Sequence, residues 1–198
     1  MPKEPEILSR KTLSAEQVAN DVLSIEEMHL QFENGAQRFY RRIKGRGRGA
    51  VLIVPMLDNE TVLLIREYSA GVHRYELQLP KGRVEPDEGI LEAANRELKE
   101  EIGKGARTLK HINTLTVLPG FMGHKTDIIL AQDLYDEKLP GDEPEEIEVV
   151  PWPLKDLLAL ANRDDCTEAR SLAALYIIRD MLAQGLDIAS TKAAESAV

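Results

Sequence analysis

The chain has 198 residues, of which 43% are hydrophobic and 30% charged, an ordinary composition for a globular protein with its own core. The formal net charge of −9 argues against a nucleic-acid partner held by phosphate contacts, and no apolar run reaches the length of a membrane span. The single cysteine, Cys166, excludes an intramolecular disulfide. We therefore expect a cytoplasmic protein with neither nucleic acid nor membrane as a partner.

The N-terminal part of the chain reads as a small β subdomain. Residues 1–20 are polar and predict a loosely ordered segment. In residues 28–43, two alternating runs flank Asn34-Gly35, a dipeptide that favours a tight hairpin in which both residues adopt positive φ. The basic stretch 38–49 is interpreted as a solvated strand end followed by a loop.

The middle of the chain predicts buried strands and then a helix. Residues 50–58 and 60–68 are apolar runs that predict a second hairpin, covered on both faces, and residues 74–80 add another strand. From Glu88 to Ile102 the pattern is helical, and Gly103 follows as a C-cap glycine. The core-facing stripe of this helix is expected to consist of Leu91, Ala94, Leu98 and Ile102.

The rest of the chain continues with strands and ends with helices. Strands are expected at 109–118, 125–134 and 146–152, and helices at 153–164 and 166–185. This order indicates an α/β (α+β) protein in which helices sandwich a mixed sheet, preceded by an antiparallel β-hairpin subdomain. We expect a β subdomain at 1–48, a main domain at 49–185 and a flexible tail at 186–198.

Three carboxylates crowd one side of the predicted helix. Glu97, Glu100 and Glu101 fall within an arc of roughly 100°, where like charges repel. A hard divalent cation removes this repulsion and prefers oxygen ligands, so Mg²⁺, with Mn²⁺ as an alternative, fits better than Zn²⁺. The other interpretation is a solvated acidic face balanced by neighbouring Lys and Arg side chains.

The surrounding residues decide between the two interpretations. Identity and spacing resemble the Nudix box at every position except Lys104, where an aliphatic residue is usual; the matching residues are Gly82, Glu88, Arg96, Glu97, Leu98, Glu100, Glu101 and Gly103. The resemblance to Nudix hydrolases implies an α/β/α sandwich that hydrolyses a nucleoside diphosphate linked to another group.

The same resemblance implies roles for individual residues. The metal ligands are expected to be Glu97, Glu101 and the backbone carbonyl of Lys81, with Glu100 as a ligand or a catalytic support. Gly82, Glu88, Arg96 and Gly103 are expected to form the scaffold of the box. In the family Glu88 pairs with Arg96, although Glu92, four residues before Arg96, is an alternative partner.

Features outside the box resemble one particular group of Nudix hydrolases. Pro119 lies sixteen residues after Gly103, as in the ADP-ribose pyrophosphatase group, whose N-terminal strands help to build a homodimer. Segments such as IREY (65–68) and GDEPE (141–145) resemble the bacterial ADP-compounds hydrolases of that group. This resemblance implies a small-molecule nucleotide substrate: ADP-ribose, diadenosine polyphosphates or NADH, cleaved to release AMP.

Further site residues are expected on loops and strand ends. A catalytic base is expected from the acidic loop, with Glu145 first and Glu143 and Glu146 next. Candidates for substrate binding are Arg66, Glu76, Tyr40, Pro119, Gly120 and His124. The alternatives are a surface ion pair for Arg66, sheet packing for Tyr40 and simple exposure for His124. Trp152 and Cys166 are expected to be structural.

Two other functions remain open at this stage. The enzyme could hydrolyse another nucleotide sugar, such as a GDP-sugar. A catalytically silent Nudix module that only binds a nucleotide is the alternative from a different class, but such a protein is expected to have lost a box carboxylate, and this chain keeps all of them.

Overall fold

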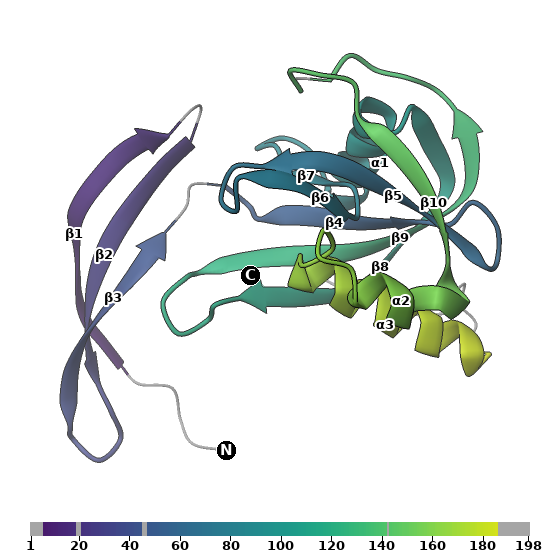
Figure 1. Cartoon of the computed structure of the whole chain (residues 1–198). Helices are drawn as coiled ribbons and strands as arrows, with labels where there is room; N and C mark the ends of the chain where they lie inside the picture. The colour runs from purple at the N-terminus through teal and green to yellow at the C-terminus, as the bar shows by residue number, and fades with distance from the viewer. Residues whose placement is uncertain (1–5, 19–20, 45–46, 142, 186–198) are drawn as a thin grey trace. The chain divides into compact units, whose positions relative to one another are not determined.

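The structure is a computed structural model that describes residues 6–18, 21–44, 47–141 and 143–185 (Figure 1). The chain divides into two compact units: residues up to 48 together with 116–125 form the N-terminal unit, and residues 49–115 together with 126 onward form the main unit. The segment 116–125 therefore belongs to the N-terminal unit although it lies far from it in sequence. The predicted tail, 186–198, is outside the described residues.

The N-terminal unit contains a three-stranded antiparallel sheet in the order β1-β2-β3. Its strands are β1 (Glu6–Val18), β2 (Asp21–Gln31) and β3 (Gln37–Lys44). The prediction of a loosely ordered N-terminus is wrong for β1, which pairs with β2 from Glu6 opposite Gln31 to Val18 opposite Asp21. Residues 6–13 are exposed, so the backbone ladder holds them without a buried apolar face. Such a strand leaves no hydrophobic alternation in the sequence.

The turn between β2 and β3 is wider than the predicted one. The strands pair as expected, but Phe32 N donates to Ala36 O at 2.9 Å, and only Gly35 of the dipeptide has positive φ, at 78°. Ala36 N donates to Asn34 Oδ1 at 3.0 Å, which satisfies the turn through a side chain instead of a second left-handed residue.

The main unit contains two sheets. One is antiparallel with the order β10-β5-β6, and the other has the order β7-β4-β9-β8 and is mixed, because β4 and β9 run parallel. Their strands are β4 (Ala50–Pro55), β5 (Thr61–Ser69), β6 (Arg74–Gln78), β7 (Lys81–Arg83), β8 (Lys104–Val117), β9 (His124–Asp136) and β10 (Glu148–Pro153).

The predicted hairpin between residues 50–58 and 60–68 is wrong. β4 and β5 lie in different sheets. Within the described residues, these two segments pair through the isolated bridge between Met56 and Val62. Asp58 Oδ1 accepts hydrogen bonds from Glu60 N and Thr61 N, both at 2.8 Å, and so turns the chain from one sheet into the other. An apolar run that is buried on both faces predicts a strand but not its partner.

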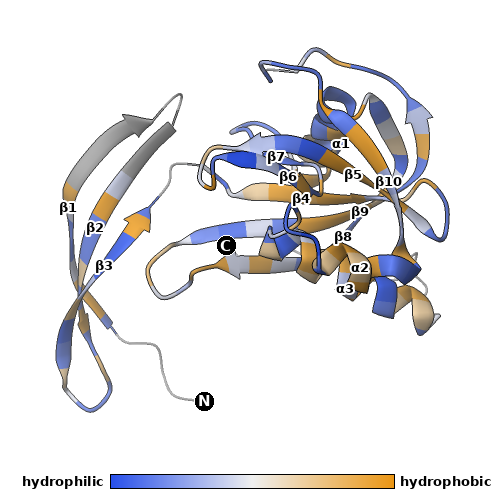
Figure 2. Cartoon of the chain, in the orientation of Figure 1, coloured by the Kyte–Doolittle hydropathy of each residue, from blue (hydrophilic) through white to orange (hydrophobic). Residues whose placement is uncertain are grey.

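Helices cover both sides of these sheets. They are α1 (Ile90–Glu101), the 3₁₀ turn η1 (Leu154–Asp156), α2 (Leu157–Ala161) and α3 (Ala169–Ala183). One core cluster packs strand residues against α1, and another packs them against α2 and α3, which lie on the opposite side in Figure 1. Buried β4 is hydrophobic along its length (Figure 2). The predicted mixed α/β fold with an N-terminal antiparallel sheet is confirmed.

The buried face of α1 differs from the predicted stripe at its first turn. Leu98 is fully buried and Ala94 lies beside it, but Leu91 is 38% exposed and Ala93 is buried instead. The buried face runs through Ala93, Glu97 and Glu101, at spacings of four, as well as through the apolar residues. A hydrophobicity pattern does not reveal this face, because two of its five buried residues are glutamates. Gly103 follows the helix with φ at 68°, as predicted for a C-cap glycine.

Truncation of the two leucines of α1 should have different effects on the free energy of unfolding. We expect Leu98→Ala to cost about 2–5 kcal/mol, because it leaves a cavity between α1 and the sheets. The matched Leu91→Ala variant should cost about 0.5 kcal/mol or less. Urea unfolding followed by circular dichroism measures both, and equal costs would contradict the burial described for α1.

Candidate active site

The glycine that opens the Nudix-like segment lies directly under α1. Gly82 is in the short strand β7, which pairs antiparallel with β4. A Cβ atom at Gly82 would overlap the carboxylate of Glu97. Any side chain here would push Glu97 out of place, so the close approach of backbone to carboxylate requires glycine.

Arg96 links the glutamates of this segment. Its Nη2 and Nε donate to the two oxygens of Glu88 at 2.7 and 3.2 Å, and Nη1 donates at 2.8 Å both to Glu97 Oε1 and to Glu100 Oε2. Glu92 instead accepts from Gly89 N at 2.9 Å at the start of α1. The guanidinium therefore pairs with Glu88 and not with Glu92, and its fixed fork bridges three carboxylates with a single positive charge.

Glu97 and Glu101 are buried carboxylates, with only 9% and 7% of their surface exposed. Burial raises the pKa of Glu97 to about 7, against the opposing effect of Arg96. Burial likewise raises the pKa of Glu101 to about 9, although Lys81 N donates to Glu101 Oε2 at 3.0 Å. Both groups are thus held where a negative charge is costly unless a cation accompanies it.

The acidic loop, residues 141 and 143–147, shares a pocket with the end of α1. The chain just before it is fixed to the helix end, because Leu139 N donates to Lys99 O at 3.1 Å. The pocket has a volume of about 450 Å³, and its lining consists of Glu100, Glu101, Lys138, Gly141, Glu143, Pro144, Glu145, Glu146 and Ile147. The structure therefore brings Glu100 and Glu101 of the box together with the three loop glutamates.

The three loop glutamates differ in their surroundings. Glu143 folds back over Gly141, and its negative charge contributes to the raised pKa of Glu97. Glu145 accepts a hydrogen bond from the hydroxyl of Tyr75, and Glu146 forms a long 3.6 Å ion pair with Lys138. Of the three, Glu143 is the one whose charge raises the pKa of Glu97.

The donor set fits a hard divalent cation. Glu97, Glu100, Glu101 and a backbone carbonyl offer oxygen ligands, the type that Mg²⁺ and Mn²⁺ prefer. Within the described residues, however, no three Asp, Glu, His or Cys side chains are grouped so as to hold a metal ion as they stand. The Arg96 guanidinium binds one oxygen of Glu97 and one of Glu100, so it competes with a cation for these two oxygens.

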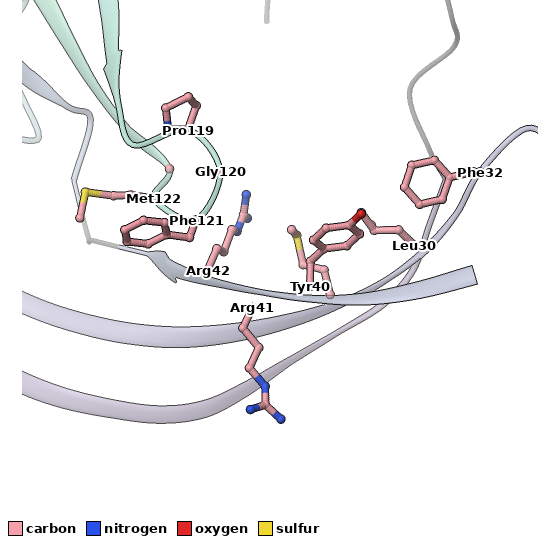
Figure 3. Close-up of a pocket in the computed structure, with 11 residues that line it drawn as sticks. Leu30, Phe32, Tyr40, Arg41, Arg42, Pro119, Gly120, Phe121 and Met122 are labelled. Atoms are coloured by element: carbon pink, nitrogen blue, oxygen red, sulfur yellow. The ribbon is translucent and has the colours of Figure 1, made fainter. Parts of the chain in front are cut away.

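A second pocket, within the N-terminal unit, gathers three of the predicted substrate-binding residues. Tyr40, Pro119 and Gly120 line a cavity of about 250 Å³ together with Phe32, Arg42 and Phe121 (Figure 3). The loop between β8 and β9, which contains Phe121, is joined to β3, since Ile43 N donates to Phe121 O at 2.7 Å. Figure 3 shows Arg41 on the opposite side of β3 from Tyr40 and Arg42, as strand alternation requires. Phe32, Arg42 and Phe121 were not predicted from the sequence, although strand alternation places Arg42 on the same face of β3 as Tyr40.

The remaining substrate-binding candidates have other surroundings. Arg66 forms ion pairs with Glu148 at 2.8 Å and Asp165 at 2.6 Å, the ordinary alternative considered for it. Glu76 is 2% exposed and binds Arg74 at 2.5 Å and Thr167 N at 2.8 Å. His124 opens β9 at the end of the 116–125 segment. Neither Glu76 nor Arg66 lines either pocket.

Two other residues have structural surroundings. Trp152 Nε1 donates to Asp156 O at 3.3 Å, and the ring packs against the core cluster of α2 and α3. Cys166 is 2% exposed, and burial raises the pKa of its thiol to about 11, so the reactive thiolate is disfavoured at neutral pH. No helix among the described residues is long and apolar enough to span a bilayer.

Comparison with known proteins identifies the family. The profile of the NUDIX domain matches residues 46–174, well over half of the chain. The chain therefore belongs to the Nudix family, and it is a pyrophosphohydrolase of that family.

Individual relatives agree with this assignment. The chain is 44% identical to the ADP compounds hydrolase NudE of Escherichia coli (strain K12) over 171 residues, 86% of this chain and 91% of that protein. It is 27% identical to the ADP-ribose pyrophosphatase of Bacillus subtilis (strain 168), over 87% of this chain and 94% of that protein. A crystal structure of an ADP compounds hydrolase superposes with a TM-score of 0.82 at 40% identity, covering 94% of this chain and 98% of that one.

The buried carboxylates predict how the stability of the metal-free protein depends on pH. Because the pKa of Glu101 is raised from 4.5 to about 9 in the folded state, folding favours the protonated form. The contribution of Glu101 to stability is therefore fully present below about pH 4.5 and is lost as the pH rises towards 9. Glu101→Gln should be more stable than the wild type at pH 8 and should lose less stability between pH 5 and 9. Thermal unfolding in EDTA measures this, and parallel pH profiles would contradict the assignment.

Proposed function

We propose that the protein hydrolyses the pyrophosphate linkage of ADP-containing compounds in a metal-dependent reaction that releases AMP. The observation that carries the proposal is the pocket in which Glu100 and the buried Glu101 adjoin the acidic loop, with the charge of Glu143 also acting on the buried Glu97. The 44% identity to an ADP compounds hydrolase over most of both chains supports the substrate class. ADP-ribose, diadenosine polyphosphates and NADH are the compounds we expect to be cleaved.

The box residues would hold the cation and orient it. Glu97, Glu101 and the carbonyl of Lys81 are the proposed ligands, with Glu100 as ligand or support. A divalent cation bound there supplies charge neutralisation for the phosphates and lowers the pKa of a bound water. Arg96, anchored on both oxygens of Glu88, keeps α1 and its carboxylates aligned with β7 when it releases Glu97 or Glu100.

Within the acidic loop, Glu143 is the best candidate for the base that accepts a proton from the attacking water. Its charge already acts on Glu97, whereas Glu145 is bound by Tyr75 and Glu146 by Lys138. This reverses the order expected from the sequence, which favoured Glu145. The hydrogen bond from Tyr75 gives Glu145 an anchoring role that fixes the loop across the sheet.

The N-terminal unit is the proposed place of nucleoside recognition. Tyr40 and Phe121 offer aromatic faces on which adenine stacks, and Arg42, which is paired with Glu26 at 2.7 Å, places a guanidinium in the same pocket for phosphate. The pocket is small, and Tyr40 and Phe121 are 45% and 46% exposed, so it leaves aromatic surface for another chain or a ligand to cover. We propose that this unit also contributes to a homodimer.

The substrate proposal has a direct test. The protein is incubated with Mg²⁺ or Mn²⁺ and ADP-ribose, diadenosine triphosphate, NADH or a GDP-sugar, and the products are separated by chromatography. We expect AMP from the first three compounds, with higher kcat/KM than for the GDP-sugar. Release of GMP from the GDP-sugar, without AMP from any ADP compound, would overturn the proposal.

Substitution of the loop glutamates tests the assignment of the base. Glu143→Gln should lower kcat about 10²- to 10⁴-fold, the usual contribution of a general base. Glu146→Gln is the matched control and should change kcat only a few-fold, because Glu146 is exposed and weakly paired. Steady-state kinetics with ADP-ribose measures kcat for both variants, and equal effects of the two substitutions would contradict the assignment of Glu143 as the base.

The oligomeric state tests the role of the N-terminal unit. We expect multi-angle light scattering to give the mass of a dimer, about twice 22.1 kDa. A monomeric mass at micromolar concentration would refute the dimer.

A further inference from the structure

Three polar side chains meet beside Glu101 without belonging to the Nudix box. Lys81 Nζ forms an ion pair with Glu67 Oε2 at 2.6 Å, and Gln78 Nε2 donates to the same oxygen at 2.7 Å. They come from three strands: β5 carries Glu67, β6 carries Gln78 and β7 carries Lys81. Gln78 is 2% exposed, so its amide is buried where it braces Glu67.

The strand register explains why these side chains converge. Glu67 pairs with Glu76, and Ile65 pairs with Gln78, so Glu67 and Gln78 are diagonal neighbours on one face of the antiparallel sheet. Two residues after β6 the chain passes Pro80, whose carbonyl accepts from Ile53 N at 2.8 Å, and enters β7. The backbone of Lys81 is thereby held in β7, and its side chain contacts Glu67 on β5.

Lys81 touches the proposed cation site in two different ways. Its backbone N–H donates to Glu101 Oε2 at 3.0 Å, while its ammonium forms an ion pair with Glu67. The positive charge of Lys81 and the negative charge of Glu67 nevertheless both act on the buried Glu101 carboxylate. The ammonium is therefore close enough to influence Glu101 but is bonded to another carboxylate.

The choice of partner matters because an ammonium and a divalent cation compete for the same oxygens. A lysine side chain is a flexible stem with a compact charge, and a direct pair with a buried carboxylate is strong in a low dielectric. If the ammonium moved from Glu67 to Glu101, it would neutralise the oxygens that are needed to hold the cation.

We propose that Glu67, braced by Gln78, is a positioning residue that withholds the Lys81 ammonium from Glu101 and so keeps this carboxylate open to a divalent cation. The inference rests on the proposed metal dependence and extends it beyond the box. It assigns Glu67 a role that does not require contact with the cation. It also gives the lysine side chain a role distinct from that of its backbone carbonyl.

The test is a double-mutant cycle on cation affinity, without substrate. Mn²⁺ binding is measured by electron paramagnetic resonance for the wild type, Glu67→Gln, Lys81→Met and the double variant. Glu67→Gln should weaken Mn²⁺ binding about tenfold in the presence of Lys81, equivalent to about 1.4 kcal/mol. In the Lys81→Met background the same substitution should change affinity less than about threefold, since no ammonium is left to move.

Controls separate this effect from loss of one negative charge. Glu60→Gln removes an equal charge at an exposed turn and should leave Mn²⁺ affinity within about twofold of the wild type, because exposed charges are screened. Circular dichroism and thermal unfolding check that each variant is folded. If Glu67→Gln does not fold, Glu67→Asp, which retracts the carboxylate by one methylene, replaces it with the same expected direction.

The outcomes distinguish the inference from the function on which it rests. A wild type that binds no Mn²⁺ would overturn the proposed metal site and this inference together. Mn²⁺ binding by the wild type, with an equal loss on Glu67→Gln in both backgrounds, would overturn this inference alone. A loss confined to the background that contains Lys81 supports it.

Discussion

The burial of two glutamates between α1 and β7 is the constraint on which the rest of the site depends. Burying a carboxylate costs free energy unless a cation or hydrogen-bond donors compensate for it. Here the compensation is divided between the Arg96 guanidinium at Glu97 and the Lys81 backbone N–H at Glu101. Gly82 follows from the same constraint, since the Glu97 carboxylate occupies the space where its side chain would be. The helix is thus held in place by groups that would otherwise destabilise it.

The charged groups around Glu97 and Glu101 are arranged in pairs across the sheets. On one side, Arg96 bridges three glutamates, and on the other Glu67, braced by Gln78, pairs with the Lys81 ammonium. The acidic loop adds further negative charge, with Glu145 fastened to Tyr75 and Glu143 left near Glu97. A site with so much negative charge and few competing ammonium contacts is suited to bind a divalent cation. The bound cation can then attract anionic phosphates to the site.

How much of this the sequence reveals depends on the range of the interactions. The box residues Glu97 and Glu101 were predictable, because helical spacing places them on one face and a resemblance fixes their neighbours. The partners of β4 were not, because a strand buried on both faces carries no signal that distinguishes one sheet from another. β1 was missed because its exposed residues lack alternation. The contacts of Glu67 with Lys81 and of Tyr75 with Glu145 join residues 14 and 70 positions apart, which a single sequence does not connect.

The assignment of residues 116–125 to the N-terminal unit has a consequence for modularity. The polypeptide passes between the two units three times. A chain divided at a single boundary therefore cannot separate one unit from the other. Removal of the first 48 residues would leave the 116–125 segment without Ile43, whose N–H bonds to Phe121 O and whose carbonyl accepts from Gly123 N. Insertions or domain grafts designed for this protein must therefore carry both segments together, although residues 49–115 lie between them in the sequence.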